Sequence, residues 1–149
     1  MDVRAILMQK FRPVHTVTID QSVDEAIQLM VAQKAGALIV TDMEMPVGMF
    51  TERDVLRCYL LDGERKFSDI NLKSAITGRF IAAKSTDAIP ELITLMIKSD
   101  LEHLPVMEDN RILGLLAFRD LVEVQLESLM EEIHQLKDYI DDLHEAGQD

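Results

Sequence analysis

Two segments of the chain show the same order of hydrophobic and polar positions. Each begins with a short alternating stretch that is typical of a strand, at residues 15–19 and 81–84. An apolar stripe at helical spacing follows in each segment and predicts an amphipathic helix. The stripe consists of Val23, Ala26, Ile27, Met30 and Val31 in the first segment, and of Ile89, Leu92, Ile93, Met96 and Ile97 in the second.

Two further strands and a closing helix complete each segment. The pattern predicts strands at 37–41 and 47–51, then at 104–107 and 112–116, with short polar links that suit hairpins. The closing helices are expected to begin near Glu52 and Phe118. A short helical stretch precedes each segment, at Val3–Gln9 and 72–77. Ser22 with Glu25 forms a capping box, and Pro90 falls in a first helical turn, where its missing N–H costs little.

The two segments are copies of one unit. A shift of 66 residues lays 14–57 on 80–123 without a gap, and nine of the 44 pairs are identical. One such unit is too small to bury both faces of its sheet. The sequence therefore predicts an α+β fold in which two β-α-β-β-α units pack sheet to sheet around a pseudo-two-fold axis. We expect the first unit at 1–62, a charged linker at 63–71 and the second unit at 72–124.

A different pattern covers residues 121–146. Apolar residues recur there at alternating steps of four and three, which is the a/d seam of a coiled coil. The seam is Val122, Leu126, Leu129, Ile133, Leu136, Ile140 and Leu143. Isoleucine at a with leucine at d favours a parallel dimer, and Glu132 would then pair with Lys137 of the other copy. The alternative is an amphipathic helix that folds back on its own module.

Charge and composition limit the classes of partner that the protein is expected to bind. The net charge is −12, and from residue 123 onward there are nine acids and one base. This balance argues against nucleic-acid binding, which depends on Lys and Arg. Cys58 is the single cysteine, expected to be a buried free thiol in a reducing compartment. We see neither a signal peptide nor an apolar stretch of membrane-spanning length, so we expect a cytoplasmic protein without membrane contact.

The start of each closing helix carries the most informative residues. The first copy reads Gly-Met-Phe-Thr-Glu-Arg-Asp from Gly48 to Asp54, and the second reads Gly-Leu-Leu-Ala-Phe-Arg-Asp from Gly114 to Asp120. Helix capping by Thr51 and Asp54 explains the first copy. It explains the second less well, because Ala117 cannot cap although the Arg-Asp pair is retained.

The unit, its tandem repeat and this run resemble the cystathionine-β-synthase (CBS) domain family, whose tandem pairs are called Bateman modules. The resemblance covers about residues 1–124. It implies that Thr51 and Asp54 bind the ribose of an adenosine-containing ligand (AMP, ADP, ATP or S-adenosylmethionine), which fits a carboxylate that accepts from vicinal hydroxyls. By the same resemblance, the residues that would line its adenine pocket are Thr16, Val17, Thr18, Ala35, Gly36 and Ala37.

The resemblance also implies a second, weaker site. Asp120 would bind its ribose, without help from Ala117. The base would lie among Ala83, Lys84, Glu102 and His103. Arg53 and Arg119 could reach a phosphate, although pairing with an acid on the helix surface is the simpler interpretation. We expect no metal site, because no histidine or cysteine spacing matches a zinc motif.

These observations favour a regulatory module that binds an adenosyl ligand and signals through a homodimer or an unidentified effector protein. The alternative is a structural dimerisation protein whose nucleotide pockets are vestigial. An enzyme is disfavoured, because the sequence holds no nucleophile elbow, phosphate loop or paired metal ligands. The ribose contacts are common to all adenosyl ligands, so they do not select among them.

Overall fold

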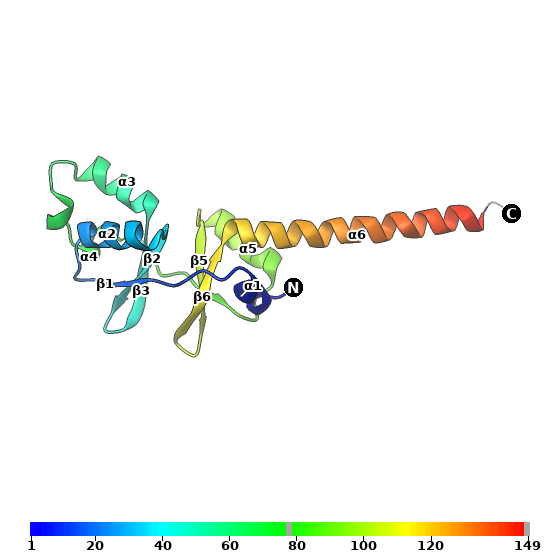
Figure 1. Cartoon of the computed structure of the whole chain (residues 1–149), viewed down its shortest axis with the longest axis horizontal. Helices are drawn as coiled ribbons and strands as arrows, with labels where there is room; N and C mark the ends of the chain where they lie inside the picture. The colour runs from blue at the N-terminus through cyan, green and yellow to red at the C-terminus, as the bar shows by residue number, and fades with distance from the viewer. Residues whose placement is uncertain (77–78, 148–149) are drawn as a thin grey trace.

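The computed structural model describes residues 1–76 and 79–147 (Figure 1). In chain order the elements are α1 (Val3–Gln9), β1 (Thr16–Thr18), α2 (Val23–Gln33), β2 (Ala37–Asp42), β3 (Met45–Thr51), α3 (Glu52–Leu61), a 3-10 turn η1 (Phe67–Asp69), α4 (Leu72–Ala75), β4 (Ala83–Lys84), α5 (Ile89–Lys98), β5 (His103–Glu108), β6 (Arg111–Ala117) and α6 (Phe118–Ala146). Residue 77, the expected end of the helix over 72–77, lies outside the described residues. None of the described helices is both long and apolar enough to cross a membrane.

The two units have the same sheet topology, which confirms the repeat. β1 pairs parallel with β2, and β2 pairs antiparallel with β3. β4, β5 and β6 repeat this arrangement. The ladder register shifts after Val40 in the first sheet and after Val106 in the second, two positions that are 66 residues apart. The strands run further than expected, so each hairpin closes through two residues at positive φ, Met43–Glu44 and 109–110.

The two sheets face each other, as the sequence predicts for a sheet-to-sheet module. Ala37, Ile39 and Leu115 are buried where they meet, with Met49 and Ile112 packed around them. Figure 1 shows the two sheets side by side, with α2 and α3 outside one and α1, α5 and α6 outside the other. The space between the units is therefore bounded by both sheets, and residues of either unit can line it.

Each unit completes its core with a segment that precedes the other unit in the chain. Val3 and Ile6 of α1 belong to the core of the second unit, whereas Leu72 and Ala75 of α4 belong to the core of the first. The repeated glycines make room for this exchange. A Cβ at Gly114 would stand 2.8 Å from Leu7 Cδ2, and one at Gly48 would stand 3.1 Å from Ile76 Cδ1. The cores thus cross the boundaries expected at residues 62 and 72.

The helical stripes are confirmed except at their last members. Val23, Ala26 and Met30 are buried, and Ile27 packs at the edge of the same core. Val31 and its repeat equivalent Ile97 are exposed instead, although the adjacent Met30 and Met96 are buried. These two side chains are free for contacts outside the module.

Removal of the Ser22 cap should lower the free energy of unfolding. The Ser22 hydroxyl accepts the backbone N–H of Glu25 at 3.1 Å. We expect Ser22→Ala to cost about 1 kcal/mol, a shift of roughly 2–4 °C in melting temperature. Ser128→Ala, on the exposed surface of α6, is the matched control. Equal melting temperatures for the two variants would contradict the prediction.

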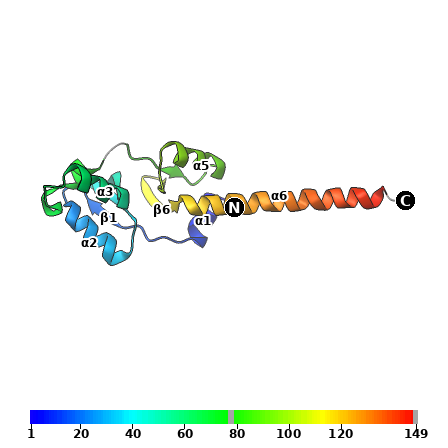
Figure 2. The same cartoon turned by 90° about the horizontal axis from the view of Figure 1, so that it is seen from above.

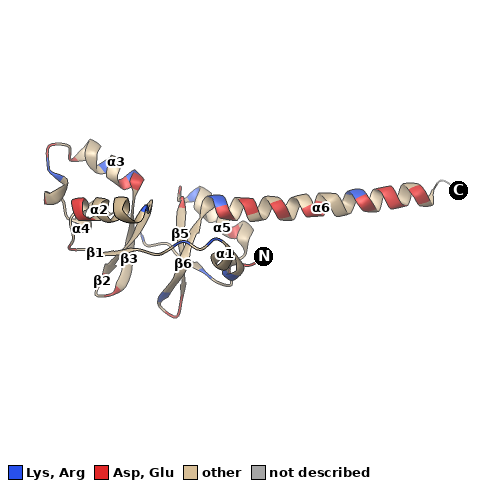
Figure 3. Cartoon of the chain, viewed as in Figure 1, with Lys and Arg blue, Asp and Glu red and all other residues tan. Residues whose placement is uncertain are grey.

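The helix α6 extends away from the module. Its 29 residues correspond to about 44 Å, and Figures 1 and 2 show most of this length projecting beyond both units. The seam residues are between 38 % and 62 % exposed. The alternative in which the helix folds back on its own module is therefore wrong. Figure 3 shows acids along the whole projecting part.

Candidate functional site

The larger of two related pockets lies between the start of α3 and the second unit. Its volume is about 310 Å³, at the lower end of the usual range for ligand pockets. The first unit contributes Gly36, Met49, Thr51, Glu52, Arg53, Asp54 and Arg57 to its lining. The second contributes Arg79, Phe80, Ile81, Ser99, Asp100, Leu101, Glu102 and His103. We call it the first pocket.

Thr51 and Asp54 lie together on the wall of the first pocket. The Asp54 carboxylate accepts the backbone N–H of Thr51 at 2.8 Å and its hydroxyl at 3.2 Å. Its other oxygen lies 2.8 Å from Arg57. Thr51 is the N-cap of α3, so the expected capping role is confirmed. The carboxylate also faces the pocket, where it can accept hydroxyl hydrogens from a ligand.

The grouping of residues differs from the sequence expectation. The resemblance implies one pocket for Thr51, Asp54 and the β1 residues Thr16, Val17 and Thr18. Those three β1 residues line neither of the two related pockets. The second unit closes the first pocket instead, through 79–81 and 99–103. The sheets face each other, so the strand entry of one unit lies opposite the helix start of the other. Of the expected adenine residues, Gly36 is the one that lines this pocket.

A smaller pocket of about 180 Å³ is the repeat equivalent of the first. It is lined by Phe11, Arg12, Pro13, His15, Gln33, Lys34, Ala35, Gly36, Ala37, His103 and Leu115. A shift of 66 residues converts most of these positions into members of the first lining. We call it the second pocket. It receives Ala35 and Ala37 and also Gly36, whereas Ala83 and Lys84, in β4, line neither pocket.

The two expected phosphate ligands are paired with acids. Arg53 reaches across to the second unit, where it contacts Asp100 at 2.7 Å and Glu102 at 2.9 Å. Arg119 lies 3.1 Å from Glu123 on its own helix. Arg53 borders the first pocket and Arg119 borders neither pocket, so only Arg53 is placed near a candidate ligand.

Three further arginines matter and were missed by the sequence reasoning. Arg57 and Arg79 line the first pocket, and Arg12 lines the second. Arg57 had a detectable signal, because it follows Asp54 by three residues on a helix. Arg12 and Arg79 precede strands and carry no periodic signal. Their positions follow only from the packing of one unit against the other.

His103 lies between the two pockets and lines both. It stands at the start of β5 and is half-buried. Burial lowers the pKa of His103, and the charge of Arg12 lowers it further. Glu102, Glu52 and Asp120 oppose these effects. The neutral imidazole is therefore favoured in the folded protein.

This pKa shift predicts a loss of stability in mild acid. Unfolded histidine takes up a proton below about pH 6.5, while folded His103 resists protonation until lower pH. The unfolded state then binds more protons, so the free energy of unfolding falls as pH drops through this window. We expect the melting temperature of wild type to fall more between about pH 7.5 and about pH 5.5 than that of His103→Gln. His134→Gln on exposed α6 is the control, and equal slopes for wild type and His103→Gln would refute the prediction.

Cys58 is buried in the core of the first unit. Burial raises the pKa of the Cys58 thiol, which disfavours the reactive thiolate. No group of three or more metal-ligating side chains is found within residues 1–76 and 79–147.

A sequence model of the CBS domain matches residues 3–61 and 71–127, which together make up most of the chain. The chain belongs to the CBS domain family. The CBS domain-containing protein CBSX3, mitochondrial, of Arabidopsis thaliana is 27 % identical over 130 residues. The alignment covers 83 % of this chain and 62 % of that protein, so this chain spans less than two thirds of the plant protein.

Solved structures share the tandem architecture. The CBS-domain containing protein ATU1752 from Agrobacterium tumefaciens has a TM-score of 0.76 at 29 % identity, covering 84 % of this chain and 99 % of that one. The CBS domain pair of MJ0100, solved with 5-methylthioadenosine and S-adenosyl-L-methionine, has a TM-score of 0.72 at 19 % identity (86 % and 98 % covered). CBSX2, solved with AMP, has a TM-score of 0.61 at 22 % identity (76 % and 88 % covered). The last two identities establish a common fold.

Proposed function

We propose that the chain is a regulatory module that binds an adenosyl ligand in the first pocket. The observation that carries the proposal is the position of Asp54 and Thr51, which share a hydrogen bond on the wall of a 310 Å³ pocket. Vicinal ribose hydroxyls can replace Thr51 or Arg57 as donors to this carboxylate, or bind beside them, because each oxygen has two lone pairs. The adenosyl ligands of MJ0100 and CBSX2 support this choice.

Arginine side chains in the lining of the first pocket can pair with a phosphate. Arg57 and Arg79 line it together with Arg53. Glu52, Asp54, Asp100 and Glu102 balance them, so the lining as a whole does not select an anion over a sulfonium. We therefore propose AMP, ADP, ATP and S-adenosylmethionine as candidates. The position of the arginines near Asp54 makes AMP the first to test.

Thermal unfolding with each candidate tests the proposal. A ligand at one hundred times its Kd should add about 2.7 kcal/mol to the free energy of unfolding. For a chain of this size the melting temperature should rise by about 5–10 °C. We expect such a rise with at least one candidate and none with a control that lacks the adenine base, such as ribose 5-phosphate at equal concentration. No rise with any candidate would contradict the proposal and favour the scaffold function.

We also propose that two copies of the chain associate, which would suit the alternative function of a dimerisation module. A set of exposed apolar residues is the observation that favours this alternative. Exposed apolar residues recur at equivalent positions of the two units: Val31 and Ile97, Leu56 and Val122, Leu60 and Leu126. Val122 and Leu126 are also the first two residues of the α6 seam. Exposed apolar patches mark protein–protein interaction sites in many proteins.

In this proposal the chain binds an adenosyl ligand and does not catalyse a reaction. The resulting conformational change is transmitted through the dimer or through an effector protein. A ligand can shift the equilibrium between two conformations of the module only as far as its affinities for those two conformations differ. The acidic balance along α6 argues against nucleic acid as a partner. A cytoplasmic location without membrane contact completes the proposal.

A further inference from the structure

The two ribose-binding acids suggested by the repeat are not equivalent in the structure. Asp54 lines the first pocket, with 15 % of its side chain exposed. Asp120, its equivalent 66 residues later, is not among the described residues that line the second pocket, and only 5 % of its side chain is exposed. Another side chain therefore covers the Asp120 carboxylate, whereas the Asp54 carboxylate stays open to its pocket.

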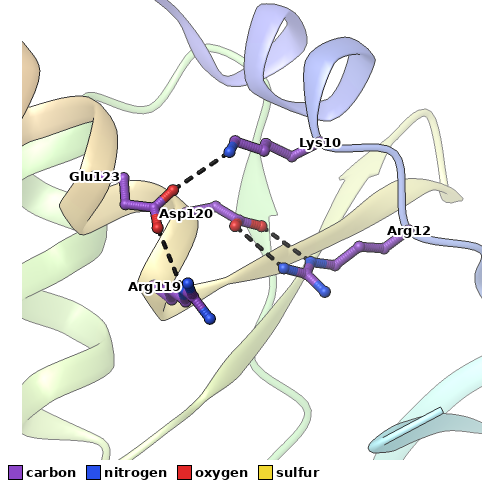
Figure 4. Close-up of polar contacts among 5 residues, drawn as sticks. All are labelled: Lys10, Arg12, Arg119, Asp120 and Glu123. Carbon is purple, nitrogen blue, oxygen red and sulfur yellow. Dashed lines mark hydrogen bonds and ion pairs between the residues drawn. The ribbon is translucent and has the colours of Figure 1, made fainter. Parts of the chain in front are cut away.

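Arg12 is the side chain that covers Asp120. Its Nε donates to one carboxylate oxygen at 2.9 Å and its terminal nitrogen donates to the other at 3.1 Å, as Figure 4 shows. This fork geometry fills the edge of the carboxylate that a pair of vicinal hydroxyls would use. Arg12 itself lines the second pocket. The guanidinium thus stands between the pocket and the acid.

The reason for this arrangement lies in a charge difference between the copies. Asp54 receives its cation from Arg57, three residues later on the same helix. The equivalent of Arg57 in the second copy is Glu123, which repels Asp120 instead of pairing with it. A buried carboxylate needs a cationic partner, and the segment between α1 and β1 supplies it. Lys10 of the same segment lies 3.3 Å from Glu123 (Figure 4).

The first pocket has no equivalent of Arg12 in the sequence. A shift of 66 residues places Gly78 at that position, a residue without a side chain. Among the described residues, the guanidinium that pairs with Asp54 is that of Arg57, and Asp54 remains part of the pocket wall. The two copies therefore differ in the residue equivalent to Arg12 and in the hydroxyl that Ala117 lacks.

We propose that Arg12 closes the second pocket to ribose, so that each chain holds one adenosyl ligand, in the first pocket. The inference rests on the proposed function for the identity of the ligand. It assigns Arg12 as the residue that decides how many pockets are open. Replacement of Arg12 should expose Asp120 and open a second site, weaker than the first because Ala117 offers no hydroxyl.

Calorimetric titration of the full chain with AMP tests the inference through the number of sites per chain. Arg12→Ala is expected to bind one more AMP than wild type, and Arg12→Ala/Asp120→Ala is expected to lose that additional site. If Arg12→Ala does not fold, Arg12→Lys keeps a cation near Asp120 but lacks the two-nitrogen fork, and it too should gain the site. The fold of each variant is checked by circular dichroism.

The comparison separates this inference from the proposed function. A gain of one site that depends on Asp120 supports the closing role of Arg12, even if wild type binds no AMP and the proposed function fails. Equal numbers of sites in wild type and in the folded Arg12 variant overturn the inference. Two sites in wild type overturn it as well, while the proposed function stands.

Discussion

Asp54→Ala is expected to weaken AMP binding by at least about 100-fold, because hydrogen bonds to a charged acceptor contribute roughly 1.5–3 kcal/mol each. Two ribose hydroxyls would lose their common acceptor at once. The substitution also removes the carboxylate that Arg57 contacts at 2.8 Å. The Arg57 side chain would then turn to solvent. The dissociation constant is measured by calorimetry on the full chain.

Controls separate lost binding from lost folding. Asp138→Ala makes the same chemical change on projecting α6, where the side chain is 62 % exposed, and should bind as wild type does. Thr51→Val removes the hydroxyl and keeps the carboxylate, so we expect a smaller loss, about 10-fold. An unchanged dissociation constant in folded Asp54→Ala would show that the ligand, if any, binds elsewhere.

Much of the fold could be predicted because the chain carries the same information twice. The 66-residue repeat fixed the order of strands and helices, and the structure confirms closing helices that begin at Glu52 and Phe118. The exposure of Val31 and Ile97 could not be predicted, because an apolar residue on a stripe looks the same whether it faces a core or a partner. Periodicity identifies an apolar face, and packing decides what covers it.

The candidate site was predicted less completely, because it lies between the copies. Thr51 and Asp54 could be found from a local motif, since capping and ligand binding both require those residue types there. The opposite wall could not, because 79–81 and 99–103 reach it only through the packing of one sheet on the other. The contact of Arg12 with the second unit could not be predicted for the same reason. Its partner Asp120 is 108 residues away in the chain.

Ile133→Lys is expected to convert a dimeric chain into a monomer. Ile133 occupies an a position at the middle of the seam, and its side chain is 62 % exposed in the single chain. In a parallel dimer two lysines would face each other in one core layer, where buried charge is strongly unfavourable. The loss of the isoleucine contact adds about 2–5 kcal/mol per chain. Light scattering of the full chain at micromolar concentration gives the mass.

The matched control distinguishes the seam from the rest of α6. Glu131→Lys makes the same lysine at an f position on the outer face, where neither helix of a dimer contacts it, and should remain dimeric. Most acids of α6 also lie at b, c and f positions, so a parallel dimer brings few of them together and pairs Glu132 with Lys137 across the interface. A dimer that survives Ile133→Lys would assign association to the exposed residues of α2 and α3. A monomeric wild type would reject self-association, and the exposed seam of α6 would then need a different partner, one that supplies an apolar helix with basic flanks.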